Sequence, residues 1–371
     1  MCSFQKELEK KLIKSRYNNF GVDNYDEFRF GKYPQVITTP LSSIQIIKKR
    51  VSKFTGYGRV QFLSTFRDFF LKYDEGLQHL YEKIDRNDRR LLVEIIAYRL
   101  LGYKKVKLQR NNKEYWHILE IVNSLVDNRD TYNPHFLHFI LQKCDLRKIE
   151  YDIQLYFSSL GVAIDFIFEQ YAYKSSKKST VEVEKGDVVF DLGACWGDTA
   201  LYFANKTGEK GKVFSFEFIP ANVEVFNLNV SLNPNFTKQI ELIKHPVSNK
   251  SEEIIYFSEN GPSSRIEFEP FEGQTGQVTT ISIDDFINNN NIAKVDFIKM
   301  DIEGSEPAAL KGAIETIKKF KPKLAIAIYH SMDDFVNIPA WISGLNLGYK
   351  LYLGHFTIHS EETILFAKVE K

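Results

Sequence analysis

An apolar strand, a glycine-spaced loop and the start of a helix follow one another in VVFDLGACWGDTAL, residues 188–201. Gly193 and Gly197 allow a sharp turn after the strand, and they let a ligand approach the backbone without a Cβ in the way. The helix that begins near Asp198 and Thr199 offers unpaired N–H groups, which favour an anionic group. The segment therefore predicts a parallel α/β sheet with a ligand at the end of its first strand; the alternative is a tight turn without a ligand.

Two acidic residues indicate what this ligand carries. Asp191 lies two residues before the first glycine, where it can pair with a cationic group. Glu217 ends the next apolar strand, about 20 residues after the loop, where a carboxylate can accept both hydroxyls of a ribose. An amino acid and a ribose in one cofactor indicate S-adenosylmethionine. The G-x-G-x-x-G dinucleotide fingerprint is absent, so a nicotinamide cofactor is the weaker alternative.

The pattern of predicted secondary structure changes near residue 175, within the polar segment KSSKKST at 174–180. Residues 1–175 show mainly helical patterns, with helices predicted over 60–84 and 88–102, and residues 176–371 alternate strands with helices. Seven strands are predicted over 187–192, 212–217, 240–244, 295–300, 322–329, 349–355 and 362–369. Helices are predicted over 198–206, 221–232, 283–288, 307–319 and 333–344. The turn between the last two strands is too short for a crossover, so we expect a mostly parallel sheet that ends in an antiparallel hairpin.

The composition disfavours several kinds of partner. The 371 residues include 49 basic and 48 acidic ones, a net charge of +1, so no overall field attracts nucleic acid or a membrane surface. Cys2, Cys144 and Cys195 form no disulfide framework, which fits a reducing compartment. Residues 1–16 are charged where a signal peptide is apolar, and no later stretch suits a membrane span. We therefore expect a cytoplasmic protein.

Five segments, in order, resemble the FkbM family of methyltransferases: VVFDLGACWGDTALYFA, FSFEFIPANVEVFNLNVSLN, TISIDDF, VDFIKMDIEGSEPAALKGAIETIKKFKPKLAIAIYH and LYLGHFTIHSEETILFA. The resemblance covers about residues 185–369, and its most specific part is KMDIEGSE at 299–306. It implies a class I (Rossmann-like) fold and S-adenosylmethionine as cofactor, with acceptors that are mostly sugars, polysaccharide units and other small natural products. The cofactor contacts that it implies are Asp191, Gly193, Ala194, Cys195, Gly197, Asp198, Thr199, Glu217, Phe218, Val247, Ser248 and Asp301.

A sugar hydroxyl is a poor nucleophile at neutral pH, so a neighbouring group must take its proton as the methyl group arrives. We expect such groups at the carboxyl ends of the fourth, fifth and sixth strands. His330 is the first choice for the base, because histidine changes protonation near neutral pH. Asp301 is expected to orient His330 or the substrate, and His355 is a second candidate base. The structural alternative for His330 is a histidine satisfied by hydrogen bonds at a strand end.

A divalent ion is the other way to activate the acceptor, with Asp301, Glu303 and Asp285 as its ligands. We do not favour this alternative and expect no metal. Lys299, within an otherwise apolar strand, is expected to pair with Glu303 or Glu306.

Substrate contacts are expected from Glu303 and Tyr329, and from the segment NGPSSRIEFE at 260–269. There, Ser263, Ser264 and Arg265 would reach the substrate or its phosphate; a plain surface loop is the alternative. NPNF at 233–236 is similar to a motif of methyltransferases that act on nucleic-acid bases, but it lies elsewhere in the chain, so base methylation is disfavoured. The N-terminal region is expected to shape the acceptor pocket or to form a homodimer interface.

The sequence thus predicts an S-adenosylmethionine-dependent O-methyltransferase for a sugar, either nucleotide-linked or in a polysaccharide pathway. The alternatives are another small natural product or a phosphate-containing acceptor, an NAD(P)-dependent oxidoreductase, and a module that binds the cofactor without turnover. The acidic and histidine residues at the strand ends count against the last.

Overall fold

The computed structural model of the chain describes residues 2–16, 21–22, 25–33, 57–135, 139–174, 180–259 and 265–370. It divides into two compact units. The smaller comprises Met1–Asn112 with Thr357–Ser360, and the larger comprises Lys113–Phe356 with Glu361–Lys371. This division differs from the predicted boundary near residue 175, because residues 113–174 pack within the larger unit.

The smaller unit is helical in the parts described, as its apolar spacing predicts. Its helices are α1 (Ser3–Ser15), α2 (Glu27–Phe30), α4 (Tyr57–Ser64), α5 (Arg67–Lys83) and α6 (Arg89–Leu101). Helix α1 buries Phe4, Leu8 and Leu12 on one face and packs against α5 and α6. The single helix expected over 60–84 is two helices, because the chain turns between α4 and α5, where the Phe66 N–H donates to the Leu63 carbonyl.

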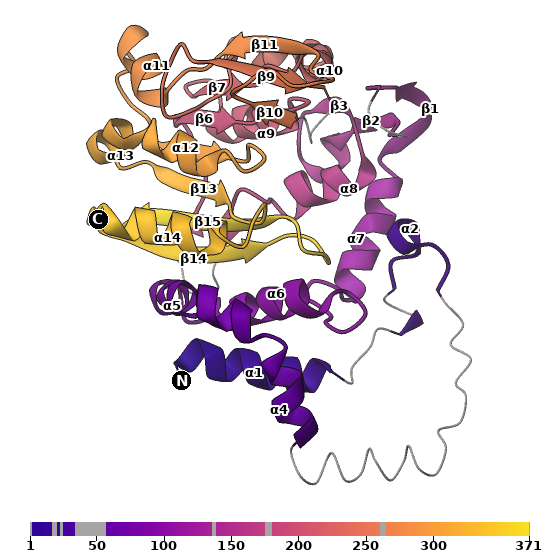
Figure 1. Cartoon of the computed structure of the whole chain (residues 1–371). Coiled ribbons are helices and arrows are strands. Elements are labelled where there is room, and N and C mark those ends of the chain that lie inside the picture. Colours follow the sequence, from indigo (N-terminus) through magenta and orange to yellow (C-terminus); the bar gives the residue numbers. More distant parts are fainter. Residues whose placement is uncertain are drawn as a thin grey trace. The chain divides into compact units, whose positions relative to one another are not determined.

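The larger unit contains a seven-stranded sheet (Figure 1). Its strands, in the order in which they lie across the sheet, are β14 (Tyr349–His355), β15 (Thr363–Val369), β13 (Lys323–Ala327), β12 (Phe297–Met300), β6 (Val188–Leu192), β7 (Lys212–Phe216) and β8 (Ile240–Ile243). β13, β12, β6, β7 and β8 pair parallel, and β15 pairs antiparallel with both β13 and β14. The order reverses between β6 and β12, which is where ligands bind in sheets of this kind.

Helices cover both faces of this sheet, as the α/β prediction requires. They are α9 (Asp198–Thr207), α10 (Pro220–Ser231), α11 (Ile283–Asn289), α12 (Glu306–Lys311), α13 (Ile314–Phe320) and α14 (Asp334–Gly344). Successive strand residues face opposite sides. On one side, Phe190 of β6 contacts Phe286 of α11; on the other, Phe297 of β12 contacts Phe203 of α9. The alternating apolar residues of the strands therefore hold helices on both faces.

The helix expected over 307–319 is interrupted after Lys311. A Cβ on Gly312 would lie 2.1 Å from the Ser248 carbonyl oxygen, so the chain passes very close to the segment after β8. The Asp284 N–H donates to the Gly312 carbonyl at 2.9 Å, so this carbonyl accepts a hydrogen bond from another segment of the chain. Tertiary contacts thus divide one amphipathic pattern into α12 and α13.

Residues 113–174 are not mainly helical, which corrects the sequence-based expectation. The elements are α7 (Lys113–Asn123), β1 (Val126–Tyr132), β2 (Leu141–Asp145), η2 (Leu146–Ile149), β3 (Gln154–Phe157), α8 (Ser159–Val162), η3 (Ala163–Ile167) and β4 (Tyr173–Lys174), which pairs with β5 (Thr180–Val181). Asn229 and Asn233 bind the backbone of β3: the side-chain oxygen of Asn229 accepts from the Tyr156 N–H at 2.7 Å, and that of Asn233 accepts from the Gln154 N–H at 2.9 Å. Asn233 of the NPNF segment, which also includes η4 (Pro234–Phe236), is therefore structural.

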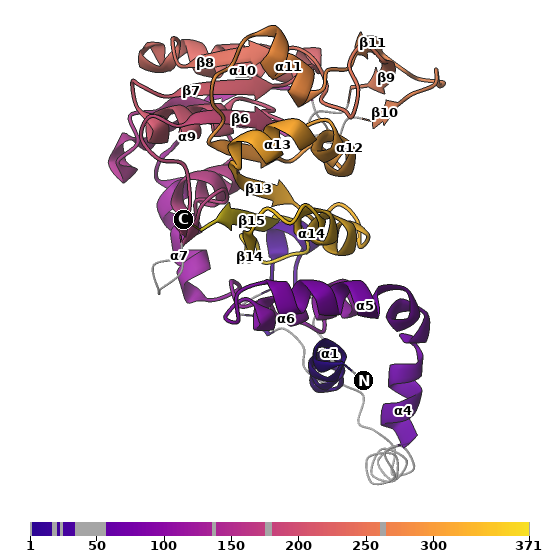
Figure 2. The ribbon, with the colours of Figure 1, turned by 90° about the vertical axis from the view of Figure 1, so that its left-hand side faces the viewer.

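A small antiparallel sheet follows β8, with the strand order β10 (Arg265–Glu267), β9 (Ile254–Ser258) and β11 (Gly276–Thr279). Figure 2 shows it on the same side of the unit as α11 and α12. Residues 265–267, expected in a loop, belong to this sheet. Among the described residues, every helix is too short or too polar to span a bilayer.

Candidate active site

A cavity of about 340 Å³ lies in the larger unit, at the carboxyl ends of the central strands. Its walls come from the segments after β6, β7, β8, β12 and β13, from the small sheet and from residues 157–171. The predicted site residues that line it are Gly193, Cys195, Asp198, Thr199, Glu217, Phe218, Val247, Ser248, Asp301, Glu303 and Tyr329. The structure therefore brings these eleven residues together around one cavity.

Gly193 is required by the packing of two strands. Its φ is 84°, and a Cβ there would lie 1.9 Å from the backbone oxygen of Asp301. The N–H groups of Gly193 and Ala194 both donate to the Phe216 carbonyl at 3.0 Å, so the loop is held by the end of β7. Ala194 is fully buried and does not line the cavity. The glycine therefore admits the segment after β12, and it also lines the cavity.

Gly193→Ala is expected to lower the free energy of unfolding by about 3 kcal/mol or more, because backbone overlap adds to the cost of a positive φ, about 1–2 kcal/mol. Gly186→Ala is the matched control, since Gly186 has the same φ of 84° and its Cβ would meet nothing within 4 Å. Urea unfolding followed by tryptophan fluorescence measures both, because Trp116, Trp196 and Trp341 all lie in the larger unit. Equal losses in the two variants would contradict the role of crowding.

Asp191 faces the interior of the protein and not the cavity. It is fully buried, and its Oδ1 lies 3.2 Å from Lys299 Nζ. The Thr199 hydroxyl donates to its Oδ2 at 2.9 Å. The cation that Asp191 was predicted to bind is therefore Lys299, and the predicted pairing of Lys299 with Glu303 or Glu306 is wrong.

Asp198 is the first residue of α9 and carries its carboxyl group into the cavity. Burial raises its pKa to about 6. Gly197 precedes Asp198 and has a φ of 84°. A Cβ on Gly197 would lie 3.0 Å from the Phe226 ring, and Gly197 does not line the cavity. The helix end that was expected to receive an anion thus already holds an acidic side chain.

Glu217 follows β7 and is almost completely buried at the cavity wall. Its Oε1 accepts from the N–H groups of Phe218 and Ile219 at 2.7 and 2.8 Å, and Asn222 donates to Oε2 at 3.3 Å. Burial raises the pKa of Glu217 to about 7, although these donors oppose the rise. The carboxyl group is therefore fixed in orientation at the edge predicted for a ribose.

Val247 and Ser248 line the cavity after β8, where the adenine was expected. Ile266 and Phe268, from the predicted covering segment, line it as well. Ser263 and Ser264 lie outside the described residues, and for Arg265 only the backbone, in β10, is described.

Asp301 follows β12 directly, and its carboxylate accepts hydrogen bonds from two hydroxyl groups. The hydroxyl of Tyr171 donates to its Oδ2 at 2.9 Å, and that of Tyr329 donates to its Oδ1 at 3.1 Å. Burial and the Asp301 charge raise the pKa of both tyrosines well above its usual range, so both keep their protons. The Asp301 carboxylate is therefore held rigidly at the cavity wall.

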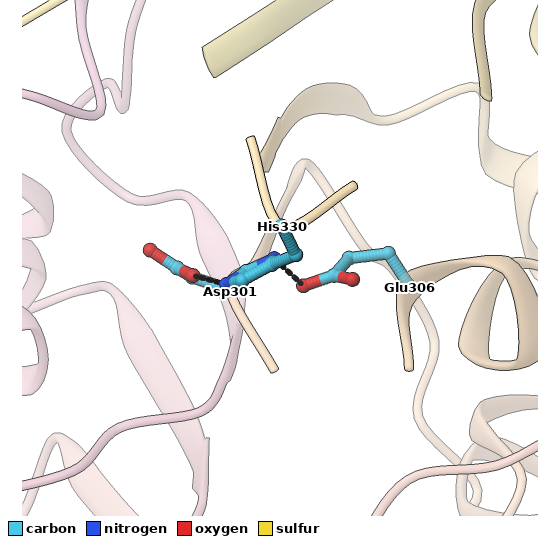
Figure 3. Close-up of side chains that lie close together, drawn as sticks. All are labelled: Asp301, Glu306 and His330. Atoms are coloured by element: carbon cyan, nitrogen blue, oxygen red, sulfur yellow. Dashed lines mark ion pairs between the residues drawn. The ribbon is translucent and has the colours of Figure 1, made fainter. Parts of the chain in front are cut away.

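His330 lies between two carboxylates, as Figure 3 shows. Its Nε2 is 3.4 Å from Asp301 Oδ1, and its Nδ1 is 3.3 Å from Glu306 Oε1. Burial opposes a charge on the ring, but Glu306, Asp301 and Glu303 outweigh it and raise the pKa of His330 to about 9. The ring is therefore protonated at neutral pH.

Glu303 lies two residues after Asp301 and has a φ of 55°. It lines the cavity, and its side chain is 44% exposed. Its Oε2 lies 3.7 Å from His330 Nε2. Burial and the Asp301 charge raise the pKa of Glu303 to about 7. Glu303 therefore changes protonation in the range where histidine was expected to act.

Besides Asp191, Ala194, Gly197 and His330, two further predicted residues are not among those that line the cavity. His355 ends β14, shares a hydrogen bond of 2.9 Å with the Thr363 hydroxyl and is not among the lining residues. Asp285 accepts from the Ser282 hydroxyl at 2.8 Å in the first turn of α11, which corrects its grouping with Asp301 and Glu303 as metal ligands. Ligand atoms of Asp301, Glu306 and His330 do lie within 4.8 Å of one another. Ion pairs of His330 with Asp301 and Glu306 hold these three residues together.

Residues 157–171 and the segment before β15 also contribute lining residues that sequence reasoning missed: Phe157, Asp165, Gln170, Tyr171 and Glu362. Burial, followed by the Asp301 charge, raises the pKa of Glu362 to about 8. Nothing local in the sequence links these positions to the loop at 193–197, because only the fold brings them together.

Residues 185–351 match the family model of the methyltransferase FkbM domain. No curated protein matches the chain.

The solved structures that are similar to the chain include the following three. The chain is 21% identical to an FkbM methyltransferase from Methylobacillus flagellatus KT, with a TM-score of 0.49, and the match covers 81% of this chain but only 60% of that one. Fibrillarin from Aeropyrum pernix, in complex with natively bound S-adenosyl-L-methionine, is 14% identical with a TM-score of 0.32, over 50% of this chain and 67% of that one. An S-adenosylmethionine-dependent O-methyltransferase from Thermotoga maritima is 13% identical with a TM-score of 0.31, over 52% and 62%.

The family match spans the loop at 193–197, the acid at the end of β7 and the turn that contains Asp301 and Glu303. Residues 185–351 are therefore similar to the methyltransferase FkbM domain.

Proposed function

We propose that this chain transfers a methyl group from S-adenosylmethionine to a hydroxyl of a sugar, either nucleotide-linked or in a polysaccharide pathway. The observation that carries the proposal is the concentration of carboxyl groups around the cavity of the FkbM domain. Asp165, Asp198, Glu217, Asp301, Glu303 and Glu362 all line it. Buried carboxyl groups favour a cationic ligand, and S-adenosylmethionine carries a sulfonium and an ammonium. The choice of a sugar follows the usual acceptors of the family.

The residues present fit this cofactor. Glu217 would hold the ribose, because its carboxyl group is fixed by Phe218, Ile219 and Asn222 while it faces the cavity. Val247 and Ser248 would lie against the adenine. The cofactor supplies a methyl group that its positive sulfur already activates, so the protein must position the acceptor and remove the acceptor's proton.

We assign the removal of this proton to Glu303. A general base works best when its pKa is close to the operating pH, and the pKa of Glu303 is about 7. It ends in the cavity and is the most accessible of the carboxyl groups around His330. His330, predicted as the base from sequence, is protonated at neutral pH and serves as a fixed positive charge. That charge favours the ionised form of Glu303 before the reaction.

Asp301 positions His330 next to Glu303. Its carboxylate is held by Tyr171 and Tyr329 and faces Nε2 of His330. The ring is therefore fixed between Asp301 and Glu306, and its charge stays next to Glu303. Tyr329, at the end of β13, also lines the cavity and would contact the acceptor.

The test combines binding with product analysis. Thermal-shift titrations with S-adenosylmethionine, S-adenosylhomocysteine and NADP are expected to raise the melting temperature with the first two only, because a bound ligand stabilises the folded state. Incubation with labelled cofactor and a panel of nucleotide sugars should then give a methylated product by mass spectrometry. Stabilisation by NADP alone would contradict the proposal, and methylation of non-sugar hydroxyls only would contradict the choice of acceptor.

A further inference from the structure

A second pocket, of about 340 Å³, lies in the smaller unit, and the proposed function leaves it without a role. Its walls come from the end of α2, from the end of α6 with the turn after it, and from residues 359–360. The lining residues that carry the argument are Arg29, Phe30, Tyr98, Arg99, Tyr103 and His359. Every lining residue that the structure describes belongs to the smaller unit, and none of them is acidic. A pocket of this volume can hold a small molecule.

Buried hydrogen bonds and ring contacts hold the walls of this pocket. The Nε2–H of His359 donates to Asp26 Oδ2 at 2.8 Å, and its Nδ1 shares a hydrogen bond of 3.0 Å with the Tyr98 hydroxyl. Phe30 contacts the His359 ring edge to face at 5.3 Å between centroids, and it stacks on Tyr103 at 3.7 Å. The Asp26 carboxylate does not line the pocket and is already bound by His359.

Positively charged side chains lie at this pocket. Arg99 donates from Nη1 to the Ser360 carbonyl at 3.3 Å, so its guanidinium group is held at the wall. Arg29 is exposed and lines the pocket from α2. Beside the pocket, Lys104 Nζ lies 5.7 Å from the centroid of the Tyr103 ring. Cations that gather around one cavity raise the local concentration of anions, so the pocket favours an anionic ligand.

We propose that this pocket binds a diphosphate group, either as the free anion or as part of a small molecule, between Arg29 and Arg99. The planar guanidinium group matches the oxygens of a phosphate through two parallel hydrogen bonds. Two such groups favour a ligand with at least two negative charges, which a diphosphate has and a single carboxylate lacks. The stacked rings of Phe30 and Tyr103 offer an apolar wall to the rest of a larger ligand. The proposed methyl transfer does not enter into this assignment.

Isothermal titration calorimetry of the full chain tests the proposal. Inorganic pyrophosphate and uridine diphosphate are titrated at constant ionic strength, with uridine as the uncharged control. Both diphosphates are expected to bind, and uridine is expected not to bind. Tighter binding of uridine diphosphate would assign the pocket to a nucleotide, whereas tighter binding of pyrophosphate would assign it to the free anion. The absence of binding by both diphosphates would overturn the proposal.

Arginine variants locate the bound diphosphate. Arg29→Gln and Arg99→Gln are each expected to weaken its binding by about tenfold or more, because each removes hydrogen bonds between charged groups. Arg99→Lys keeps the charge without the planar group and should recover only part of the loss. Arg90→Gln is the control and should leave the affinity unchanged, since Arg90 also lies on α6 but its side chain is 76% exposed and does not line the pocket.

The two glutamine variants also separate this pocket from the cavity of the larger unit. A diphosphate bound in that cavity would keep its affinity in both variants, and this result would overturn the proposal. An equal loss in Arg90→Gln would do the same, because it would show a general effect of charge. If Arg99→Gln lowers the melting temperature, Arg29→Gln decides the outcome, because Arg29 is exposed.

Discussion

Glu303→Gln is expected to lower kcat by about 10²- to 10⁴-fold, the usual contribution of a general base. The affinity for the cofactor should stay within a few-fold, because the amide fills the same space. In the unmodified protein, Glu303 is ionised above its pKa of about 7, so kcat should rise with pH through that value. The variant should lose this dependence. Steady-state rates between pH 5.5 and 9, with saturating cofactor, measure both effects.

Two further variants make this result specific. Glu272→Gln changes an exposed acid outside the cavity and should leave kcat unchanged. His330→Gln should move the rise in kcat to higher pH, because the imidazolium charge lowers the pKa of Glu303. An unaltered pH profile in Glu303→Gln would exclude Glu303 as the base. A complete loss of activity in His330→Gln at every pH would return that role to His330.

Lys299→Met is expected to lower the free energy of unfolding by about 3–5 kcal/mol. The substitution removes the cation that faces Asp191 and leaves a fully buried carboxylate uncompensated, which is far more costly than the pair is favourable. Urea unfolding with tryptophan fluorescence measures the loss. The double variant Asp191→Asn with Lys299→Met should regain part of it, because no unpaired charge remains.

The matched control for this pair is Lys212→Met. Lys212 also lies in a strand of the sheet and pairs with Glu241 at 2.8 Å, but the two side chains are 33% and 49% exposed. Removing such a pair costs at most about 1 kcal/mol. A loss for Lys299→Met no larger than for Lys212→Met would show that the interior tolerates the unpaired Asp191.

The local pattern of the sequence predicted the elements that carry the site. Apolar runs with glycine at 193 and 197 and with an acid at 217 predicted a strand, a loop and a second strand, and Glu217 does line the cavity. Short apolar runs are sufficient to predict the strands, because successive residues of a strand face opposite sides of a sheet and both sides are covered here. The split of residues 307–319 into two helices was not predictable, since it depends on the close approach of Gly312 to Ser248.

The sequence by itself determined which residue types stand at the strand ends, because strand periodicity and loop glycines are local properties. Only the tertiary structure decided how those residues are paired. Asp191 is paired with Lys299, and His330 lies between Asp301 and Glu306. Asp165 lines the same cavity as Asp198, although the sequence analysis placed it in another domain. Charge and burial depend on neighbours that are distant along the chain, so the protonation of each group follows from the fold.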